Sequence, residues 1–462
     1  MGKSSTKTHQ ENDKSKADIC KDADPAAKDK AAVALDLGHD DRAAAVLYWN
    51  KRARIKWVVT LFLGAFLVYA ARTSMSISVM AISAELGWNK QVSGMVLSSF
   101  FAGYVTTNVL GGYLADKYSG EKVMLYCSVL WITMTALVPL FARYHGFLFM
   151  SSTFGVLVAR FLTGVGQGMH FPSMTTIVTR RNPINERPLV WGISISGSAL
   201  GTIFSGFAGS FIIENIGWPS FFFAVGVLGY IWSFFLRMNV HAVSEKDDMT
   251  LSKANKPFAK KESTPWLLLF SKLETWALLV VYFCNNLCFY NLLSWLPVYF
   301  HETFPHSKGW VFNVVPWIAS FAVSVLSGYV ARSLINSNFS VTFVRKLCTS
   351  VALYGGGTFL LLLDFAETFE QALFLMTMIL GVMAFSNVGP VQNAQDLAPK
   401  YAGALYGVMN SFGAFAGIVG VYLSGHLLEA FGKWSAVFHL SSGACFVGCT
   451  VFLIFGSGER IV

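Results

Sequence analysis

Charged side chains are scarce in this chain. Asp, Glu, Lys and Arg make up only 13% of its 462 residues, whereas hydrophobic residues make up 54% and aromatic residues 15%. Ordinary soluble domains carry about 25% charged residues, so the composition argues against a soluble multidomain protein of this length. The sequence instead predicts a polytopic membrane protein.

Motifs of catalysis and metal binding are also missing. The seven cysteines form no Cys-x-x-Cys pattern, which argues against a zinc site or a disulfide framework. No phosphate-binding loop of the P-loop type occurs, so a nucleotide would be cargo rather than fuel. No Ser, His and acid share a predicted helix face. We therefore expect neither an enzyme nor a bound metal or cofactor.

Twelve apolar stretches are long enough to cross a bilayer, since a hydrocarbon core of about 30 Å requires about 20 apolar residues in a helix. The predicted spans are 57–82, 91–114, 123–142, 150–178, 189–213, 219–236, 274–297, 311–331, 347–363, 371–394, 402–428 and 434–456. They predict an all-α membrane protein.

Polar segments divide these spans into two sets of six. Residues 1–56 begin without the apolar core of a signal peptide and predict a disordered cytosolic N-terminus. Residues 57–237 would form one six-helix bundle, 238–273 a cytosolic linker and 274–456 a second bundle, followed by a cytosolic C-terminus at 457–462.

Lys and Arg are distributed unevenly over the predicted loops. With a cytosolic N-terminus, the luminal loops contain only Lys90, Arg143, Lys308 and Lys433, and most other loop Lys and Arg residues fall on the opposite side. The positive-inside rule therefore predicts that both termini are cytosolic. The formal net charge of +9 follows from this asymmetry and does not indicate nucleic-acid binding.

The two predicted halves look like copies of one another. Gly192, Glu214 and Gly217 recur as Gly407, Glu429 and Gly432, each displaced by 215 residues. Two halves related by an axis along the membrane normal are typical of transporters that rock around a substrate held near the midplane. The two glutamates lie at predicted luminal helix ends, where we expect them to be solvated or to cap helices.

A single arginine, Arg160, interrupts the uncharged run 155–172. A central Arg in a membrane helix costs between about 2.5 and more than about 10 kcal/mol, so it requires a partner or a watery cavity. The nearest polar residue on the same helical face is Gln167, which carries no charge. Because a guanidinium suits phosphate oxygens, Arg160 is our principal candidate ligand for an anion. The alternative is a structural pairing with a carbonyl or a distant acid.

Three glycines follow Arg160 at positions 164, 166 and 168. A glycine-rich phosphate loop would follow a strand, and none is predicted here. The spacing therefore predicts close helix packing.

The loop Gly112–Lys122 resembles the loop between the second and third helices of major facilitator transporters. The resemblance implies that Asp116, Lys117 and Lys122 latch neighbouring helix ends, in a fold of two pseudo-symmetric six-helix bundles. In the second half Arg332 stands at the acidic position, which predicts a weaker or differently paired latch.

Within that superfamily the chain resembles solute carrier family 17 from about residue 57 to 456. This family transports organic anions in vesicles and lysosomes and includes phosphate and acidic-sugar carriers. The family-like stretches are 97–104, 160–172 and 393–403, the last of which contains Asp396 as a further latch residue. The nucleotide-carrying branch is resembled most closely, in the stretches 87–90, 293–297, 302–305, 308–317 and 344–346.

Two departures from the wider family bear on coupling. Proton-coupled members carry Glu where this chain has Gln167, and glutamate carriers carry Arg where it has Asn285. Gln cannot titrate, so the resemblance implies a different anion and no obligatory proton coupling at this position. The alternative is that Gln167 only links helices by a hydrogen bond.

Further candidates for substrate binding carry weaker signals. Arg72 resembles a first-helix arginine of the family that could attract or gate the anion, or it could extend to the membrane interface. His170 lies near the face of Arg160, but a lone His is more often a hydrogen-bond donor within a bundle. Asn285, Asn286 and Tyr290 could meet ribose or base from the second half, or simply contact other helices.

The resemblance implies uniport of purine nucleotides such as ATP, ADP and GTP from the cytosol into secretory vesicles or lysosomes, in preparation for exocytosis. A membrane potential from a vesicle proton pump would drive it, with chloride as a candidate activator. The alternatives are a proton- or sodium-coupled organic anion or phosphate symporter of the same fold and, from another class, an anion channel or nutrient receptor.

Overall fold

The computed structural model describes residues 48–143, 151–182, 187–254, 265–306 and 308–461. Over these residues the chain forms helices and no strand. Of the segment 1–56 that was predicted to be disordered, residues 1–47 lie outside the described part of the chain. Its last residues are helical, since helix α4 begins at Lys51, which corrects the predicted boundary.

Twelve helical crossings follow one another along the chain, in two sets of six. The first set comprises α4 (Lys51–Leu86), α5 (Lys90–Lys117), α6 (Gly120–Arg143), α7 (Ser152–Gly168) with α8 (His170–Arg181), α9 (Arg187–Phe204) with the π-helical turn η2 (Ser205–Gly209) and α10 (Ser210–Asn215), and α11 (Trp218–Ala254).

The second set begins after the short helix α12 (Trp266–Phe270). It comprises α13 (Leu273–Thr303), α14 (Gly309–Asn336), α15 (Val341–Ser350) with η3 (Val351–Gly355), α16 (Gly356–Leu362) and η4 (Leu363–Phe365), α17 (Phe369–Met383) with η5 (Ala384–Asn387) and α18 (Pro390–Leu397), then η6 (Pro399–Tyr401), α19 (Ala402–Phe431) and α20 (Trp434–Phe455).

Ten of these crossings are long and apolar enough to span a bilayer. The other two are α5 and the α7–α8 pair, which correspond to the second and fourth predicted spans. The fourth crossing is divided at Met169, and Pro172 lies in the first turn of α8, where a missing N–H is tolerated. The predicted all-α fold is confirmed.

The internal repeat has a backbone cause. Gly217 and Gly432 both adopt positive φ angles, 111° and 63°, in the turns that precede α11 and α20. This left-handed conformation favours glycine because a side chain there would meet the backbone. The repeated glycines are therefore the turn residues of equivalent helix connections.

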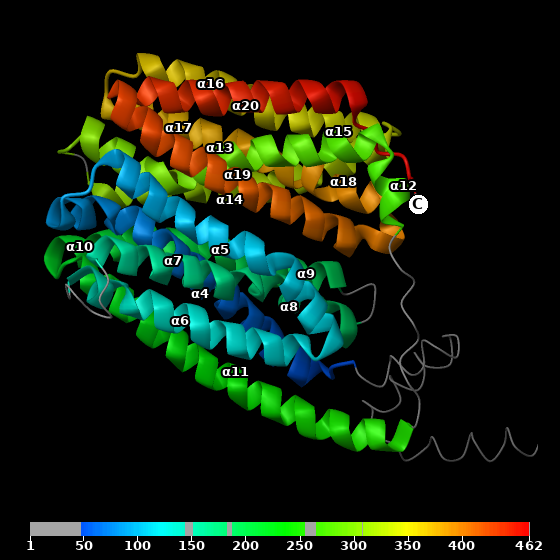
Figure 1. Cartoon of the computed structure of the whole chain (residues 1–462). Helices are drawn as coiled ribbons and strands as arrows, with labels where there is room; N and C mark the ends of the chain where they lie inside the picture. The colour runs from blue at the N-terminus through cyan, green and yellow to red at the C-terminus, as the bar shows by residue number, and fades with distance from the viewer. Residues whose placement is uncertain (1–47, 144–150, 183–186, 255–264, 307, 462) are drawn as a thin grey trace, which may run out of the picture.

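The helices pack as two halves (Figure 1). In the first half α4 packs against α9, α7 against α5 and α6, and α11 against α6. In the second, α13 packs against α19 and α20, and α14 against α17. The halves meet through α5 and α19, α4 and α13, and α14 with α9 and η2. Helices α4, α5 and α9 of the first half are thus the ones that face α13, α14 and α19 of the second.

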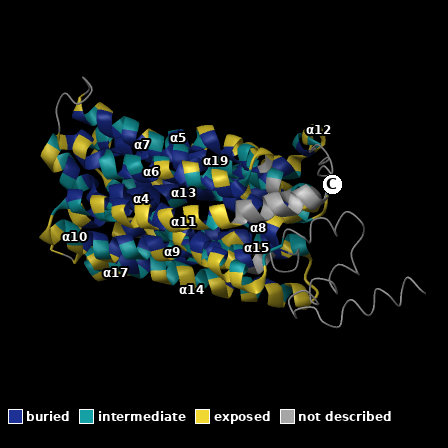
Figure 2. Ribbon diagram, turned by 90° about the horizontal axis from the view of Figure 1, so that it is seen from below, coloured by how far each residue is buried: buried dark blue, intermediate teal, exposed yellow. Residues whose placement is uncertain are grey.

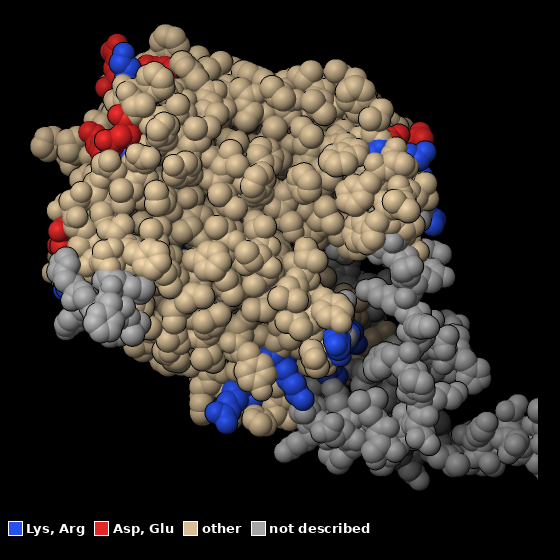
Figure 3. Space-filling view, viewed as in Figure 1, with Lys and Arg blue, Asp and Glu red and all other residues tan. Residues whose placement is uncertain are grey.

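Burial follows this arrangement. In the most apolar stretch of α13, 83% of the residues are buried, whereas in that of α14 only 28% are buried. Figure 2 shows exposed residues along α11 and α14. Large apolar side chains such as Phe211, Phe234 and Tyr329 are exposed on the outside. Figure 3 shows a broad uncharged surface with charged side chains at its margins, as expected of a protein surrounded by lipid.

The predicted linker region contains helical structure at both of its ends. Helix α11 continues past the predicted bundle boundary at residue 237 to Ala254, and α12 occupies Trp266–Phe270. The assignment of residues 238–273 as the division between two domains stays a prediction.

Contacts between the halves gather at the end that the charge pattern assigns to the lumen. Lys90, the first residue of α5, forms an ion pair with Glu302 of α13, and its backbone N–H donates to Glu429 Oε2 at 3.0 Å. Close by, Gly94 of α5 lies directly against Gly425 of α19. Glu429 therefore caps a helix of the opposite half, in agreement with the capping role predicted for it.

Removing the Lys90 side chain is expected to loosen this end. In a Lys90→Ala protein, a cysteine placed at Ser76 in a cysteine-free background should react about two to five times faster with an impermeant thiol reagent applied from the luminal side. The expected change in reaction rate corresponds to the loss of a partly exposed ion pair, which is worth up to about 1 kcal/mol. The exposed Lys433 serves as a control, because Lys433→Ala should leave the rate unchanged. An unchanged rate in Lys90→Ala would contradict the role of this contact.

Candidate substrate site between the two halves

The site begins with the crossing of α5 and α7. A Cβ atom at Gly164 would lie 2.0 Å from the Phe100 carbonyl oxygen, and one at Gly103 would lie 1.9 Å from the Phe161 carbonyl oxygen. Only glycine allows the two backbones to approach this closely. The close packing predicted for the α7 glycines is therefore observed, and it brings Arg160, one turn before Gly164, against α5.

Two guanidiniums meet at one aromatic ring. The Cζ atom of Arg160 lies 5.1 Å from the centroid of Phe100, and that of Arg72 lies 4.8 Å from the same centroid. Arg72 also lies over Tyr69 at 4.6 Å and over Tyr104 at 5.2 Å. Each of these distances is within the range of a cation–π interaction. Helices α4, α5 and α7 thus hold two cations within a small aromatic cluster.

Both arginines are buried, with 4% of Arg72 and 3% of Arg160 exposed. Arg72 therefore does not extend to the membrane interface, which corrects that alternative. Nε of each arginine, and Nη2 of Arg72, have no hydrogen-bond partner among the described residues. No described carboxylate lies within ion-pair distance of either guanidinium.

This pair of cations is electrostatically unfavourable on its own. The distances to Phe100 place the two charges at most about 10 Å apart, where they repel by at least on the order of 2 kcal/mol at an effective dielectric constant of about 20. Cation–π contacts contribute roughly 0.5–2 kcal/mol each, so the four observed contacts offset the repulsion. They leave Nε of both arginines and Nη2 of Arg72 without a hydrogen-bond partner among the described residues. The cluster is therefore suited to receive an anion.

Gln167 lies on α7 but is engaged with α4. Its Nε2 donates to the Val68 carbonyl at 3.1 Å, and its Oε1 is buried and has no hydrogen-bond partner within the described ranges. This bond is the interhelical role that the sequence left open as an alternative. It fixes α7 against α4, the helix that carries Arg72.

His170 is completely buried behind the arginines. Its ring lies 6.0 Å from Trp232 and 5.4 Å from Phe171, and its edge contacts Gly64. Neither ring nitrogen has a hydrogen-bond partner among the described residues. The structure thus places His170 among aromatic side chains within the first half, and shows no donated hydrogen bond of the kind proposed as the alternative.

The second half contributes α13. Tyr290 packs on Phe101 of α5, with ring centroids 4.4 Å apart, and so reaches the other half. Asn286 donates to the Tyr282 carbonyl of its own helix at 2.8 Å, while no described residue hydrogen-bonds the buried Oδ1 of Asn285. Of the three α13 candidates, Tyr290 is therefore the one that the structure brings to the arginine cluster.

A second contact joins the halves at the same level. Asn410 of α19 donates to the Tyr104 hydroxyl at 3.3 Å. Tyr104 also stacks on Arg72, so one side chain touches both the cation cluster and the opposite half. The cluster therefore lies at the seam between the halves.

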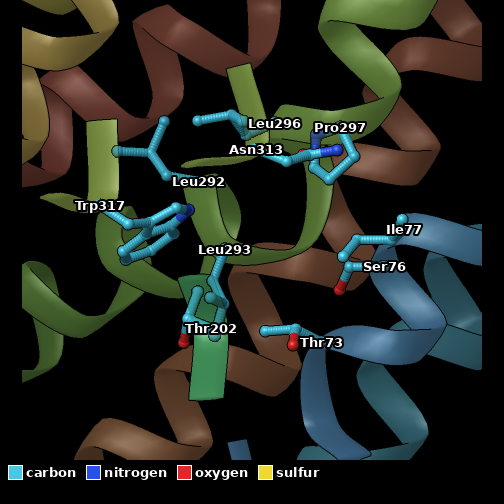
Figure 4. Close-up of a pocket in the computed structure, with 10 residues that line it drawn as sticks. All are labelled: Thr73, Ser76, Ile77, Thr202, Leu292, Leu293, Leu296, Pro297, Asn313 and Trp317. Atoms are coloured by element: carbon cyan, nitrogen blue, oxygen red, sulfur yellow. The ribbon is translucent and has the colours of Figure 1, made fainter. Parts of the chain in front are cut away.

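A small cavity of about 250 Å³ lies next to this seam (Figure 4). Thr73, Ser76 and Thr202 line it with hydroxyl groups from the first half, and Leu293 and Trp317 line it from the second. The space free for the centre of a water-sized sphere is only about 10 Å³, which is enough for about one water molecule. A nucleotide would require the halves to move apart.

The latch residues occupy the opposite, predicted cytosolic, helix ends. Asp396 at the end of α18 pairs with Arg345 near the start of α15, with Nε and Oδ2 2.7 Å apart. In the first half the corresponding pair is Glu121 on α6 and Arg181 on α8, at 2.8 Å. In each half an ion pair thus links the third crossing to the fourth. The acid lies on the third crossing in the first half and on the fourth crossing in the second.

The other predicted latch residues are placed less directly. Lys117 Nζ lies over the rings of Tyr113 and Tyr118, at 5.6 and 5.4 Å. Lys122 is exposed, and its backbone N–H donates to Ser119. The side chain of Asp116 lies outside the described part of the chain.

Reasoning from the sequence missed the aromatic members of the site, Tyr69, Phe100 and Tyr104, and the amide of Asn410. A signal was present for some. Tyr69 stands three residues before Arg72, and Phe100 stands four before Tyr104, so each pair shares a helix face.

Two six-helix halves that enclose, at their seam, buried cations without a carboxylate partner among the described residues are typical of a membrane transporter. A family model described as "Major Facilitator Superfamily" matches residues 61–345. The mouse voltage-gated purine nucleotide uniporter SLC17A9 is 38% identical over 416 residues, covering 89% of this chain and 92% of that protein. The human protein of that name is also 38% identical, with 89% and 94% covered.

More distant relatives include the chloroplastic sodium-dependent phosphate transport protein 1 of Arabidopsis thaliana, 33% identical with 94% and 85% covered. Among solved structures, a bacterial homologue of the human lysosomal transporter Spinster superposes with a TM-score of 0.66 at 14% identity, with 88% and 96% covered. A D-xylose–proton symporter gives 0.67 at 12%, with 88% and 99% covered. The chain belongs to the major facilitator superfamily and, within it, to solute carrier family 17.

Proposed function

We propose that this protein is a uniporter of purine nucleotides, which it moves as anions from the cytosol into the lumen of secretory vesicles or lysosomes. Arg160 and Arg72 would bind the phosphates, and Tyr290, with Asn285 and Asn286, would meet the ribose or base. Gln167 and His170 would support the arginines from behind. The observation that carries the proposal is the pair of buried guanidiniums around Phe100, which have no carboxylate partner in the described part of the chain.

The relatives support the choice of substrate. The mouse and human proteins described above are named as voltage-gated purine nucleotide uniporters. In this chain Gln167, which cannot titrate, hydrogen-bonds a backbone carbonyl. A site with two positive charges and no titratable acid among its described residues suits a polyanion that moves without an obligatory proton.

Voltage is a sufficient driving force for such cargo. One charge crossing 100 mV gains about 2.3 kcal/mol, so an anion of charge −3 to −4 gains roughly 7–9 kcal/mol from a lumen-positive potential. A vesicle proton pump would supply that potential, and chloride would act as an activator rather than a driving ion. Closure of the predicted luminal end by Lys90, with both termini cytosolic, supports loading from the cytosol.

Purified protein in liposomes tests the proposal. An imposed inside-positive potential should drive uptake of labelled ATP in the absence of any proton or sodium gradient, and collapse of the potential with an ionophore should stop it. Uptake that requires a proton or sodium gradient at zero potential would contradict uniport.

The second candidate is an ion-coupled organic anion or phosphate symporter. It is favoured by the 33% identity to a protein named as a sodium-dependent phosphate transporter. The same liposomes distinguish it, because labelled phosphate would then enter with a sodium gradient. Binding without any flux would instead indicate a receptor.

A further inference from the structure

We propose that Phe100 is a positioning residue that holds Arg72 and Arg160 side by side as one two-cation site, and that this pairing selects anions that carry several negative charges. The inference rests on the proposed function, since it concerns how the arginines are prepared for an anion. Phe100 lies in the stretch 97–104, for which the resemblance to the family implied no role.

The geometry singles out Phe100 among the aromatic residues. It is the one described ring that lies under both guanidiniums, at 4.8 and 5.1 Å, and it is fully buried. Tyr69 and Tyr104 contact Arg72 alone. Without the ring, the two charges would face each other across an apolar gap with no described carboxylate to hold them.

An aromatic ring is suited to this task for a chemical reason. A carboxylate would hold the arginines equally well but would consume their N–H donors and cancel their charge. A ring face attracts a cation through its quadrupole and leaves the in-plane N–H groups available. The orphan nitrogens of both arginines agree with this arrangement.

The backbone fixes Phe100 in place. Its carbonyl oxygen lies where a Cβ of Gly164 would be, so α5 and α7 cannot shift apart or together without moving the ring relative to Arg160. The next residue, Phe101, packs on Tyr290 of the other half and on Gly417. The ring under the arginines is thus attached to the helix that forms the seam.

A selectivity consequence follows. A polyphosphate can engage both guanidiniums at once, whereas a monophosphate can be satisfied by one. Holding the two arginines together therefore strengthens the binding of ATP more than that of AMP. A weaker attraction between the Phe100 ring and the guanidiniums should reduce this difference in affinity.

Replacing Phe100 with mono-, di- and trifluorophenylalanine weakens the cation–π attraction while retaining the shape of the ring. In voltage-driven liposome uptake by the full-length chain, KM for ATP should rise stepwise with the number of fluorine atoms, in total by roughly three- to tenfold. The inhibition constant of AMP as a competitor should change much less. The same series at Phe452, a fully buried residue of α20, should change neither value.

Conservative variants provide a second measurement. Phe100→Tyr should retain the preference for ATP over AMP, and Phe100→Leu should lose it at comparable amounts of folded protein. A flat KM for ATP through the fluorinated series, or equal rises for ATP and AMP, would overturn the proposal. Failure of the proposed function would be seen separately, as absence of ATP uptake by the parent chain under an inside-positive potential.

Discussion

Arg160→Met abolishes voltage-driven ATP uptake and leaves the protein at least as stable as the parent chain; this is the expected result. Removing one member of a buried charge-assisted contact costs about 2–5 kcal/mol, which corresponds to a loss of uptake of more than about 30-fold. Stability should not fall, because Arg160 is buried with no described carboxylate partner and its removal relieves a desolvated charge. Uptake kinetics and thermal unfolding in detergent measure the two effects.

Loss of uptake without loss of thermal stability would identify Arg160 as a residue that binds the substrate rather than one that holds the fold together. Arg237→Met, at an exposed arginine of α11, is the matched control and should alter neither quantity. Arg160→Lys should recover part of the uptake, since an ammonium keeps the charge but loses the planar fork. A fall in thermal stability comparable to the loss of a buried ion pair would show that Arg160 holds the fold together.

Gly164→Ala is expected to have the largest effect on folding. The new Cβ would lie 2.0 Å from the Phe100 carbonyl oxygen, which is backbone and cannot rotate away. Helices α5 and α7 would have to separate, at a cost of about 1–3 kcal/mol or more. The separation would also displace Phe100 from Arg160, so uptake per folded molecule should fall together with thermal stability.

Gly328→Ala in α14 is the matched control for this substitution. Nothing lies within 4 Å of a Cβ built at Gly328, so alanine there should be neutral or should stabilise the helix by up to about 1 kcal/mol. If Gly164→Ala proved as mild as Gly328→Ala, the close crossing of α5 and α7 would not be needed for the site.

Several features of the fold could be predicted from the sequence because they depend on local pattern. Apolar runs of about 20 residues correspond to crossings for any arrangement of neighbours. The 215-residue repeat predicted equivalent turns, and Gly217 and Gly432 show why glycine recurs there. The close packing of the α7 glycines followed from their small size alone, without knowledge of the helix they would meet.

The candidate site could be predicted only in part. Arg160 and Arg72 were identifiable because a charge in an apolar run is visible in the sequence. Their shared contact with Phe100 was not, since it depends on how α4, α5 and α7 rotate about their axes. The hydrogen bond from Gln167 to the Val68 carbonyl could not be predicted either, since it also depends on how the helices are rotated.

By itself, the sequence determined that this chain is a membrane protein of two repeated six-helix halves with isolated arginines in its apolar spans, because hydropathy and repetition are properties of the chain in order. Only the tertiary structure decided what surrounds those arginines and what joins the halves. Tyr104 and Asn410 are 306 residues apart in the chain, and Lys90 and Glu302 are 212 apart. Such contacts form only when separate helices pack, since packing sets which faces of distant helices meet.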